Sequence, residues 1–169
     1  MKKIMLKVKN FQGTPFKCWC GPSTLKIIFD FYGLNIAEKK LAQLCGTNRE
    51  FGTNVKKMEK VSKDFGFKFR IQDNSNFKEI EKWLKKGIPV IVDWFTRGRN
   101  DYNDSDVADG HYSVVVGLDD KYIYVSDPEI GRVRKMEREK FLMVWFDFKG
   151  NQIKKPTDII LRRMIVIYK

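Results

Sequence analysis

The hydrophobic positions of this chain follow a helical spacing in the first half and a strand spacing in most of the second half. Between Pro22 and Gly33, apolar residues recur every three or four positions, at Leu25, Ile28, Phe29 and Tyr32. This spacing predicts an amphipathic helix that begins at Pro22, because proline has no N–H to leave unpaired at the first helical position. Gly33 is expected to end it.

Four more helices are predicted farther along the chain, at 36–44, 55–65, 76–86 and 137–145. The first three begin beside residues whose side chains can cap a helix N-terminus: Asn35, Thr53 or Asn54, and Asn76. Glu79 stands three residues after Asn76, which is the spacing of a capping box. Glycines at 46, 66 and 87 follow these three helices and are typical of helix C-termini.

Strands are predicted where short runs of β-branched and aromatic residues lie between turn residues. The expected strands are 4–8, 67–71, 90–95, 111–118, 122–126, 132–135 and 164–168. An order of elements in which helices come first and antiparallel strands follow is typical of an α+β fold. We expect 1–169 to form a single domain, in which an N-terminal helical half packs on a C-terminal antiparallel sheet with a cleft between them.

Composition indicates a chain that buries a core in a reducing compartment. Hydrophobic residues make up 43% of the 169 residues, which excludes a disordered chain. The three cysteines, Cys18, Cys20 and Cys45, are an odd number that does not fit a framework of secreted disulfides. The chain shows neither a signal-peptide pattern nor an apolar run of membrane-spanning length, so we expect a cytoplasmic protein.

The chain is strongly basic, with a formal net charge of +12. Its lysines and arginines occur in every segment and often stand beside glutamate, as in 56–60. Such scatter is typical of a solvated surface rather than a binding groove, and no nucleic-acid-binding motif is present. We therefore expect no specific nucleic-acid partner. The sequence sets no oligomeric state.

Cys20 is the first candidate for chemistry. It lies at the start of the helix predicted from Pro22, where unpaired N–H groups and the helix dipole stabilise a thiolate. A thiolate with a base within reach is a nucleophile. A thioredoxin redox motif also begins Trp-Cys-Gly-Pro, but Ser23 stands where its second cysteine would be. The remaining alternative is a buried structural cysteine.

His111 is the only histidine of the chain, which excludes a metal site built from several imidazoles. A zinc site formed by His111 with Cys18, Cys20 and Cys45 would need a Cys-x-Cys spacing that suits structural zinc poorly. We therefore expect no metal ion and no cofactor. His111 begins a predicted strand directly after a loop, so its side chain can reach a cleft; a structural histidine is the alternative.

Asp127, sixteen residues after His111, is the candidate partner of this imidazole. If Gly117 pairs with Lys121, the two residues fall directly opposite each other, with Cβ atoms about 5 Å apart. A strict two-residue turn at 119–120 would instead place them on opposite faces. A shared face therefore requires odd parity or a β-bulge. A carboxylate there would fix the tautomer of the imidazole and stabilise its cation.

Residues 96–110 form the longest irregular stretch of the chain. Asp101, Asn103 and Ser105 have the spacing of the first ligands of a calcium loop, but Asp106 replaces the glycine that such a loop needs. We interpret the stretch as a flexible loop that borders the cleft.

Several other segments, together with Cys20, His111 and Asp127, form an ordered series of motifs along the chain. They are Gln12, Cys20-Gly21-Pro22-Ser23, 51–54, 65–67, 87–92, Gly110-His111-Tyr112-Ser113, Ser126-Asp127-Pro128 and 141–145. In this order, over 12–145, the chain resembles the papain-like peptidases that process bacteriocin leaders after a double glycine. Many members of that family are fused to membrane transporters. This chain has no phosphate-binding loop of a transporter ATPase and is similar to the stand-alone branch.

The resemblance implies a papain-like fold and a cysteine peptidase. Cys20 would be the nucleophile, His111 the general base and acid, and Asp127 the orienting carboxylate. Gln12 would donate its side-chain amide to the oxyanion, beside the backbone N–H of Cys20. The family glutamine stands six residues before its cysteine, whereas Gln12 stands eight before Cys20 and six before Cys18. Spacing makes Cys18 a rival nucleophile, while the Gly-Pro pair and the helix start favour Cys20.

These residues imply cleavage of an amide in a peptide or protein substrate, after small residues such as glycine by the resemblance. An attacking thiolate gives a thioester, which water resolves in a peptidase or amidase. If an amine resolves the thioester, the same residues carry out a transglutaminase-like acyl transfer. A papain-like module that binds a peptide without cutting it is the remaining alternative, although Cys20 and His111 are both present.

Overall fold

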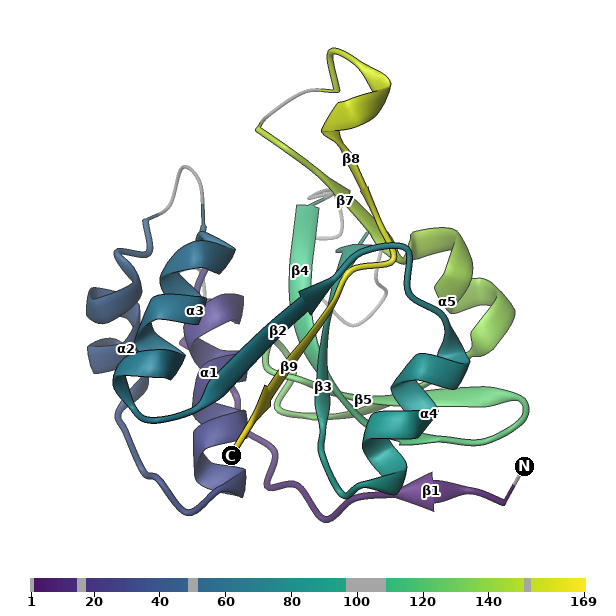
Figure 1. Cartoon of the computed structure of the whole chain (residues 1–169), viewed down its shortest axis with the longest axis horizontal. Helices are drawn as coiled ribbons and strands as arrows, with labels where there is room; N and C mark the ends of the chain where they lie inside the picture. Colours follow the sequence, from purple (N-terminus) through teal and green to yellow (C-terminus); the bar gives the residue numbers. More distant parts are fainter. Residues whose placement is uncertain (1, 15–17, 49–51, 97–108, 151–152) are drawn as a thin grey trace.

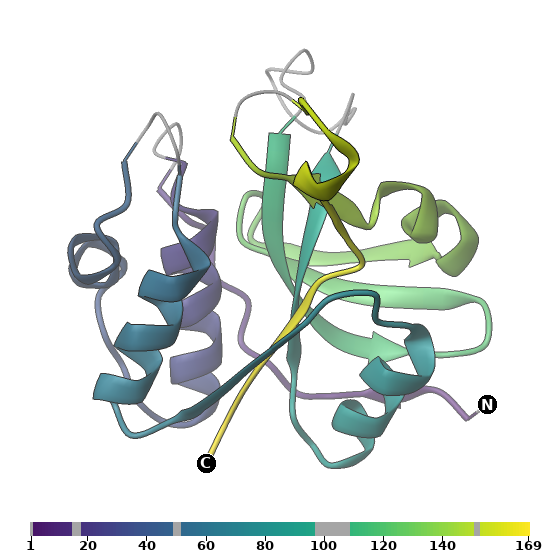
Figure 2. The ribbon, with the colours of Figure 1, turned by 45° about the horizontal axis from the view of Figure 1, so that its top comes forward.

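The computed structural model describes residues 2–14, 18–48, 52–96, 109–150 and 153–169. Within these residues, three helices from the first part of the chain lie on one side of a sheet and two later helices lie on the other (Figures 1 and 2). The helices are α1 (Cys20–Phe31), α2 (Glu38–Cys45), α3 (Val55–Asp64), α4 (Phe77–Lys85) and α5 (Arg138–Val144). The predicted α+β fold, with an N-terminal helical half on an antiparallel sheet, is confirmed.

The main sheet is antiparallel throughout the described residues, in the order β2-β9-β3-β4-β5-β6, with β1 paired to β4. Its strands are β1 (Ile4–Met5), β2 (Lys68–Gln72), β3 (Val90–Thr96), β4 (Asp109–Leu118), β5 (Tyr122–Asp127), β6 (Arg132–Glu137) and β9 (Met164–Tyr168). β1 is shorter than predicted, and β4 begins two residues earlier. Most of the stretch predicted to be a loop over the cleft, 97–108, lies outside the described residues.

A second, two-stranded sheet was not predicted from the sequence. It pairs β7 (Phe146–Phe148) with β8 (Ile159–Leu161), which follows the short 3-10 helix η1 (Pro156–Asp158). The hairpin projects beside the end of the sheet at which β4 begins (Figure 1). Phe95 of β3 stacks on Phe146 with ring centroids 5.1 Å apart, which joins the hairpin to the main sheet.

Two of the predicted helix starts are wrong. α1 begins at Cys20, with Trp19 in the N-cap position, so Pro22 is its third residue rather than its first. Proline is still tolerated there, because no N–H of the first turn has an intrahelical partner. Asn35 does not cap α2, which follows Ala37; its side chain accepts a hydrogen bond from Lys26 Nζ at 2.9 Å instead.

The other predicted caps are confirmed. The side chain of Asn54 accepts a hydrogen bond from Lys56 N–H at the start of α3. Asn76 and Glu79 form the predicted capping box of α4. No helix in the described part of the chain is long and apolar enough to span a membrane.

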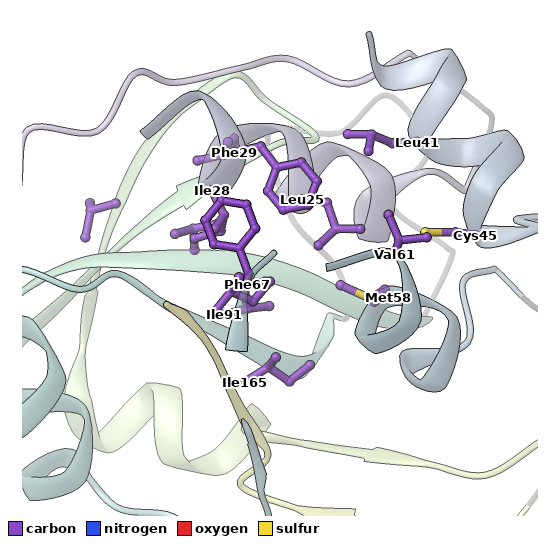
Figure 3. Packing of buried hydrophobic residues seen from close by; sticks show 14 of the residues in the cluster. Leu25, Ile28, Phe29, Leu41, Cys45, Met58, Val61, Phe67, Ile91 and Ile165 are labelled. Carbon is purple, nitrogen blue, oxygen red and sulfur yellow. The ribbon is translucent and has the colours of Figure 1, made fainter. Parts of the chain in front are cut away.

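The core between the sheet and α1 fixes where the start of that helix lies. Phe29 of α1 stacks on Phe67 with ring centroids 5.1 Å apart, above Ile91 and Ile165 of the sheet (Figure 3). Leu25, Phe29, Ile91 and Ile165 are fully buried. Each such side chain contributes about 1.5–3 kcal/mol relative to its exposed state. This packing holds α1 against the sheet and brings its N-terminal residue, Cys20, next to the residues of β4.

Candidate active site

The first turn of α1 presents Cys20 in a half-buried position. Ser23 donates its N–H to the carbonyl of Trp19 at 2.9 Å, which closes the turn, and its hydroxyl oxygen lies 2.7 Å from the same carbonyl oxygen. Gly21 packs against Thr53, and a Cβ at Gly21 would lie only 2.6 Å from Thr53 Cβ. Position 21 therefore has to be glycine for the turn to approach the segment before α3.

Cys18 occupies a different environment two residues earlier. It is exposed, and its φ of 54° lies in the left-handed region that non-glycine residues rarely adopt. It lies before α1 begins, so it does not share the helix start of Cys20. The structure thus separates the two candidate nucleophiles by position and exposure.

His111 on β4 and Asp127 at the end of β5 form a buried pair. His111 Nε2 and Asp127 Oδ1 are 2.8 Å apart, and the two side chains are 6% and 0% exposed. The ring of Trp94 on β3 lies edge-on to the imidazole, with centroids 5.7 Å apart. The pair that strand parity predicted is therefore formed.

The register that produces this pair differs from the prediction. The observed partners are Leu118 with Ile123, Gly117 with Tyr124, Val115 with Val125 and Val114 with Ser126. The predicted pairing of Gly117 with Lys121 is wrong, and Asp127 does not lie directly opposite His111. A bulge between Val115 and Gly117 shifts the register by one residue. Asp127 then continues the ladder opposite Ser113, on the same face as His111. The predicted bulge is confirmed.

Asp127 is held by more than the histidine. Its Oδ2 accepts a hydrogen bond from Arg134 Nε on β6 at 2.5 Å, and its Oδ1 accepts one from the backbone N–H of Glu129 at 3.0 Å. Burial alone would raise the pKa of this carboxyl, but the charges and hydrogen bonds of His111 and Arg134 hold it well below its usual 3.8. Asp127 is therefore an anion in a fixed position.

The same contacts set the charge of the imidazole. Burial would lower the pKa of His111, but the charge and hydrogen bond of Asp127, together with a hydrogen bond to Cys20, raise it to about 10. Because Nε2 faces Asp127, Nδ1 is the nitrogen that remains for the sulfur of Cys20. The raised pKa keeps His111 protonated at neutral pH, so a proton donor lies beside the sulfur of Cys20.

Gln12 lies beside this group without a hydrogen bond from its side chain to it. Its side chain is exposed, and its Cβ packs over Gly131, where an added Cβ would lie 2.7 Å away. The next residue, Gly13, donates its N–H to the carbonyl of Pro128 at 2.7 Å. Gln12 thus borders the turn that follows Asp127, and its side chain is exposed to solvent.

Glu38 is a structural residue of the site that sequence reasoning missed. It is 7% exposed, and its carboxylate accepts hydrogen bonds from Thr14 N–H, from the Thr14 hydroxyl at 2.5 Å and from the Ser23 hydroxyl at 2.5 Å. These bonds connect the segment after Gln12 to the first turn of α1. The sequence around Glu38 did not indicate that it would be buried, because a glutamate at the start of a polar helix is normally solvated.

Arg134 and Glu129 were also missed, although the sequence held a signal for both. Arg134 pairs with Val125 across the β5–β6 hairpin, which places it on the same face as Asp127. Glu129 follows Asp127 by two residues in the turn, and its Oε2 lies 3.7 Å from His111 Nδ1. Strand parity applied to this second hairpin would have pointed to Arg134.

Two acidic residues, Asp93 and Asp147, lie beside the backbone just before His111. Asp93 on β3 is 1% exposed and lies close to Asp147 on β7, with Arg163 Nη1 3.9 Å away. Burial first, and then the negative charge of Asp147, raises the pKa of Asp93 well above its usual value. A Cβ at Gly110 would lie 2.5 Å from Asp147 Oδ1, so this acidic pair packs directly against the backbone before His111.

The donor groups of the described residues fit acid–base chemistry better than metal binding. His111, Asp127 and Glu129 each bring one ligand atom within 4.8 Å of the others. Both oxygens of Asp127 are already engaged, by His111 and by Arg134, whose positive charge opposes a cation. Cys45 lies in the core, where burial raises the pKa of its thiol to about 12, which does not suit a thiolate ligand.

The three cysteines are expected to react with iodoacetamide in a defined order. Cys20 should be alkylated first, because it is half-buried beside the imidazole of His111, which can take up the proton of its thiol. Cys45 should stay unmodified in the folded protein, since its side chain is buried and its thiol pKa is raised. Mass spectrometry of tryptic peptides after a brief treatment near neutral pH measures this order. Faster modification of Cys18 would identify it as the nucleophile.

Two curated relatives are similar to this chain in sequence. An uncharacterized protein of Methanothermobacter thermautotrophicus is 28% identical over 145 residues, which cover 82% of this chain and 84% of that protein. The lactococcin-G-processing and transport ATP-binding protein LagD of Lactococcus lactis is 29% identical over 117 residues, which cover 69% of this chain and 15% of LagD. The matched region is thus a small part of LagD and most of the archaeal protein.

Solved structures share the fold. The peptidase domain of Streptococcus ComA, a bifunctional ABC transporter involved in quorum sensing, superimposes with a TM-score of 0.68 at 22% identity, covering 95% of this chain and 97% of that domain. A double glycine motif protease from an AMS/PCAT transporter, solved in complex with its leader peptide, gives a TM-score of 0.63 at 23% identity, covering 98% and 94%.

The family is shown by the extent of the sequence match. Residues 5–153 match the Peptidase_C39 like family, so the match includes Gln12, Cys20, His111 and Asp127. The fold and the matched region agree with the resemblance to the double-glycine peptidases that the sequence pattern indicated. The chain belongs to the Peptidase_C39 like family.

Proposed function

We propose that the protein is a cysteine peptidase that cleaves a peptide bond with Cys20 as nucleophile, His111 as general base and acid, and Asp127 as orienting carboxylate. The observation that carries this proposal is the buried His111–Asp127 pair, with Cys20 close enough to the imidazole to raise its pKa. Arg134 completes the row by fixing the far oxygen of Asp127.

The proposed reaction begins with attack of the Cys20 thiolate on the carbonyl carbon of the scissile amide. The imidazolium of His111 then gives its Nδ1 proton to the leaving nitrogen, and the first product leaves as an amine. The neutral imidazole next removes a proton from water, which attacks the thioester and releases the carboxylic acid. Throughout, Asp127 keeps the Nε2 hydrogen in place and stabilises the imidazolium.

The oxyanion of each tetrahedral intermediate needs donors that are aimed at it. The backbone N–H of Cys20 is one, because the first N–H groups of a helix have no intrahelical partner. The side-chain amide of Gln12 is the proposed second donor, and its exposure lets it turn toward a bound carbonyl. The Glu38 hydrogen bonds hold Thr14, two residues after Gln12, to α1 and limit how far Gln12 can move.

Replacement of Gln12 by alanine is expected to lower kcat by about 10²–10³-fold, with little change in the stability of the exposed segment. The matched control is Gln43→Ala, which removes an exposed amide from α2, away from the site. Steady-state kinetics on one cleaved peptide compares the two variants. Equal losses in both, or no loss in either, would remove Gln12 from the oxyanion hole.

The substrate class follows from the family and its relatives, and it belongs to the proposal. LagD is named for processing lactococcin G, and the PCAT protease was solved with a leader peptide. We therefore propose a peptide or protein substrate that is cut after small residues such as glycine. The three cysteines are free, which agrees with a reducing compartment, and we propose the cytoplasm.

The test is incubation of the wild-type protein and the Cys20→Ala protein with a library of unstructured peptides, followed by mass spectrometry. New termini that appear only with the wild-type protein support a peptidase. New isopeptide or amide bonds between library peptides would instead indicate acyl transfer. A wild-type protein that cuts no peptide yet binds one tightly would indicate a module that binds without cleaving.

A further inference from the structure

Glu129 lies on the side of the imidazole that faces the reacting bond. Its Oε2 is 3.7 Å from His111 Nδ1, whereas Nε2 faces Asp127. The Glu129 side chain is 40% exposed, compared with 6% for His111. The carboxylate is therefore at the opening of the site, between the buried imidazole and solvent.

The backbone of the turn keeps this carboxylate in place. Glu129 N–H donates to Asp127 Oδ1 at 3.0 Å, so the turn is tied to the same carboxylate that orients His111. Gly131, in the same turn, lies against Gln12. The turn thus lies between His111, the proposed proton donor, and Gln12, the proposed oxyanion donor. Glu129 is the charged residue of this turn.

Proton transfer places the leaving group close to Glu129. A general acid must come within hydrogen-bonding distance of the nitrogen that it protonates, which puts the leaving nitrogen next to His111 Nδ1. A carboxylate 3.7 Å from that Nδ1 is within reach of the side chain of the residue that carries the leaving nitrogen. Glu129 therefore borders the first residue after the scissile bond.

Because the chain as a whole is strongly basic, a carboxylate at the site can affect which substrates bind. The formal net charge of +12 repels a cationic substrate in general, so a local anion at the site has a disproportionate effect on which substrates bind productively. A carboxylate pairs with lysine or arginine through charge-assisted hydrogen bonds, and it repels aspartate and glutamate.

We infer that Glu129 selects substrates with a lysine or arginine directly after the scissile bond. The inference rests on the proposed peptidase function and adds the substrate class on the leaving-group side. The contact acts before the amine product departs, so it changes kcat/KM, which reports acylation, and leaves hydrolysis of the thioester unchanged.

The kinetic test uses one peptide that the wild-type protein cleaves, prepared with lysine, glutamine or glutamate directly after the cut. Wild-type kcat/KM should be about five- to tenfold higher for lysine than for glutamine. Glu129→Gln should bring this ratio to about one, and Glu129→Lys should favour glutamate. Glu59→Gln, a partly exposed glutamate on α3, is the matched control and should keep the wild-type ratio. An unchanged ratio in Glu129→Gln overturns the inference, even if cleavage itself is intact.

A binding measurement keeps the inference testable without turnover. Lys-Gly-Gly amide and Gln-Gly-Gly amide resemble the departing amine product, and each should slow the alkylation of Cys20 by iodoacetamide. The lysine peptide should protect at lower concentration, and Glu129→Gln should remove the difference. Protection that favours lysine in a protein that cleaves nothing would retain this inference and refute the proposed function. Equal protection by both peptides would overturn the inference alone.

Discussion

Replacement of Cys20 by alanine is expected to abolish cleavage of every peptide that the wild-type protein cuts, a loss of about 10⁴-fold or more in kcat. The variant lacks the sulfur that is proposed to form the thioester, while His111 and Asp127 keep their pairing. Its free energy of unfolding should stay within about 1 kcal/mol of wild type, because Cys20 is small and half-buried. Kinetics together with urea unfolding followed by circular dichroism measures both quantities.

Cys18→Ala is the matched control for this experiment. It removes the same side chain two residues earlier, from an exposed position outside α1. The control should keep nearly full activity and stability. If Cys18→Ala were inactive and Cys20→Ala active, the glutamine spacing would have identified the nucleophile better than the helix start did.

Replacement of Asp127 by alanine is expected to lower both activity and stability. Without the carboxylate, the pKa of the buried imidazole falls, and the thiolate loses its imidazolium partner. We expect kcat/KM to fall by about 10²-fold or more, although less than in His111→Ala, because the carboxylate orients the base and does not replace it. The free energy of unfolding should fall by about 3–5 kcal/mol, because Arg134 and His111 would lose the anion they surround.

The stability difference should depend on pH in a defined way. The pKa of Asp127 is lowered on folding, so its contribution is present above the usual 3.8 and is lost as the pH falls through the lowered value. The pKa of His111 is raised, so its contribution is complete below 6.5 and is lost as the pH rises through about 10. The difference in the free energy of unfolding between wild type and Asp127→Ala should therefore be largest in weakly acidic solution, above 3.8 and below 6.5. It should shrink as the pH falls through the lowered pKa of Asp127 or rises through about 10, the pKa of His111.

Asp30→Ala provides the comparison for stability. Asp30 pairs with Lys26 one helical turn away in α1, outside the site, and such pairs contribute about 0.3–0.5 kcal/mol. Denaturant unfolding across the pH range should show a small and nearly constant effect for this variant. An equally small effect of Asp127→Ala would contradict the view that the buried triad of Arg134, Asp127 and His111 supports the fold.

Local signals in the sequence accounted for most element types and for the choice of Cys20 and His111 as candidate site residues. The apolar spacing from Leu25 to Tyr32 predicted α1, and the caps at Asn54 and Asn76 were found where they were expected. These features depend on contacts within a few residues, so the sequence contains what determines them. A single histidine and a cysteine at a helix start likewise left few candidates for chemistry.

The pairing of β4 with β5 was predicted from the sequence only in part. The need for His111 and Asp127 to share a face predicted an irregular hairpin, and the bulge between Val115 and Gly117 supplies it. The position of the bulge, and therefore which residues pair, was not predicted. A bulge exchanges one set of backbone hydrogen bonds for another of similar energy, so packing against neighbouring strands and helices selects among registers.

What the sequence determined by itself was the order of helices and strands, their faces and a short set of candidate residues for chemistry. Only the tertiary structure decided that Glu38 would be buried, where its carboxylate accepts hydrogen bonds from Thr14 and Ser23. Periodicity and capping act between near neighbours in the chain. The burial and partners of a charged side chain depend instead on segments that are distant in sequence and meet only when the sheet and helices pack together.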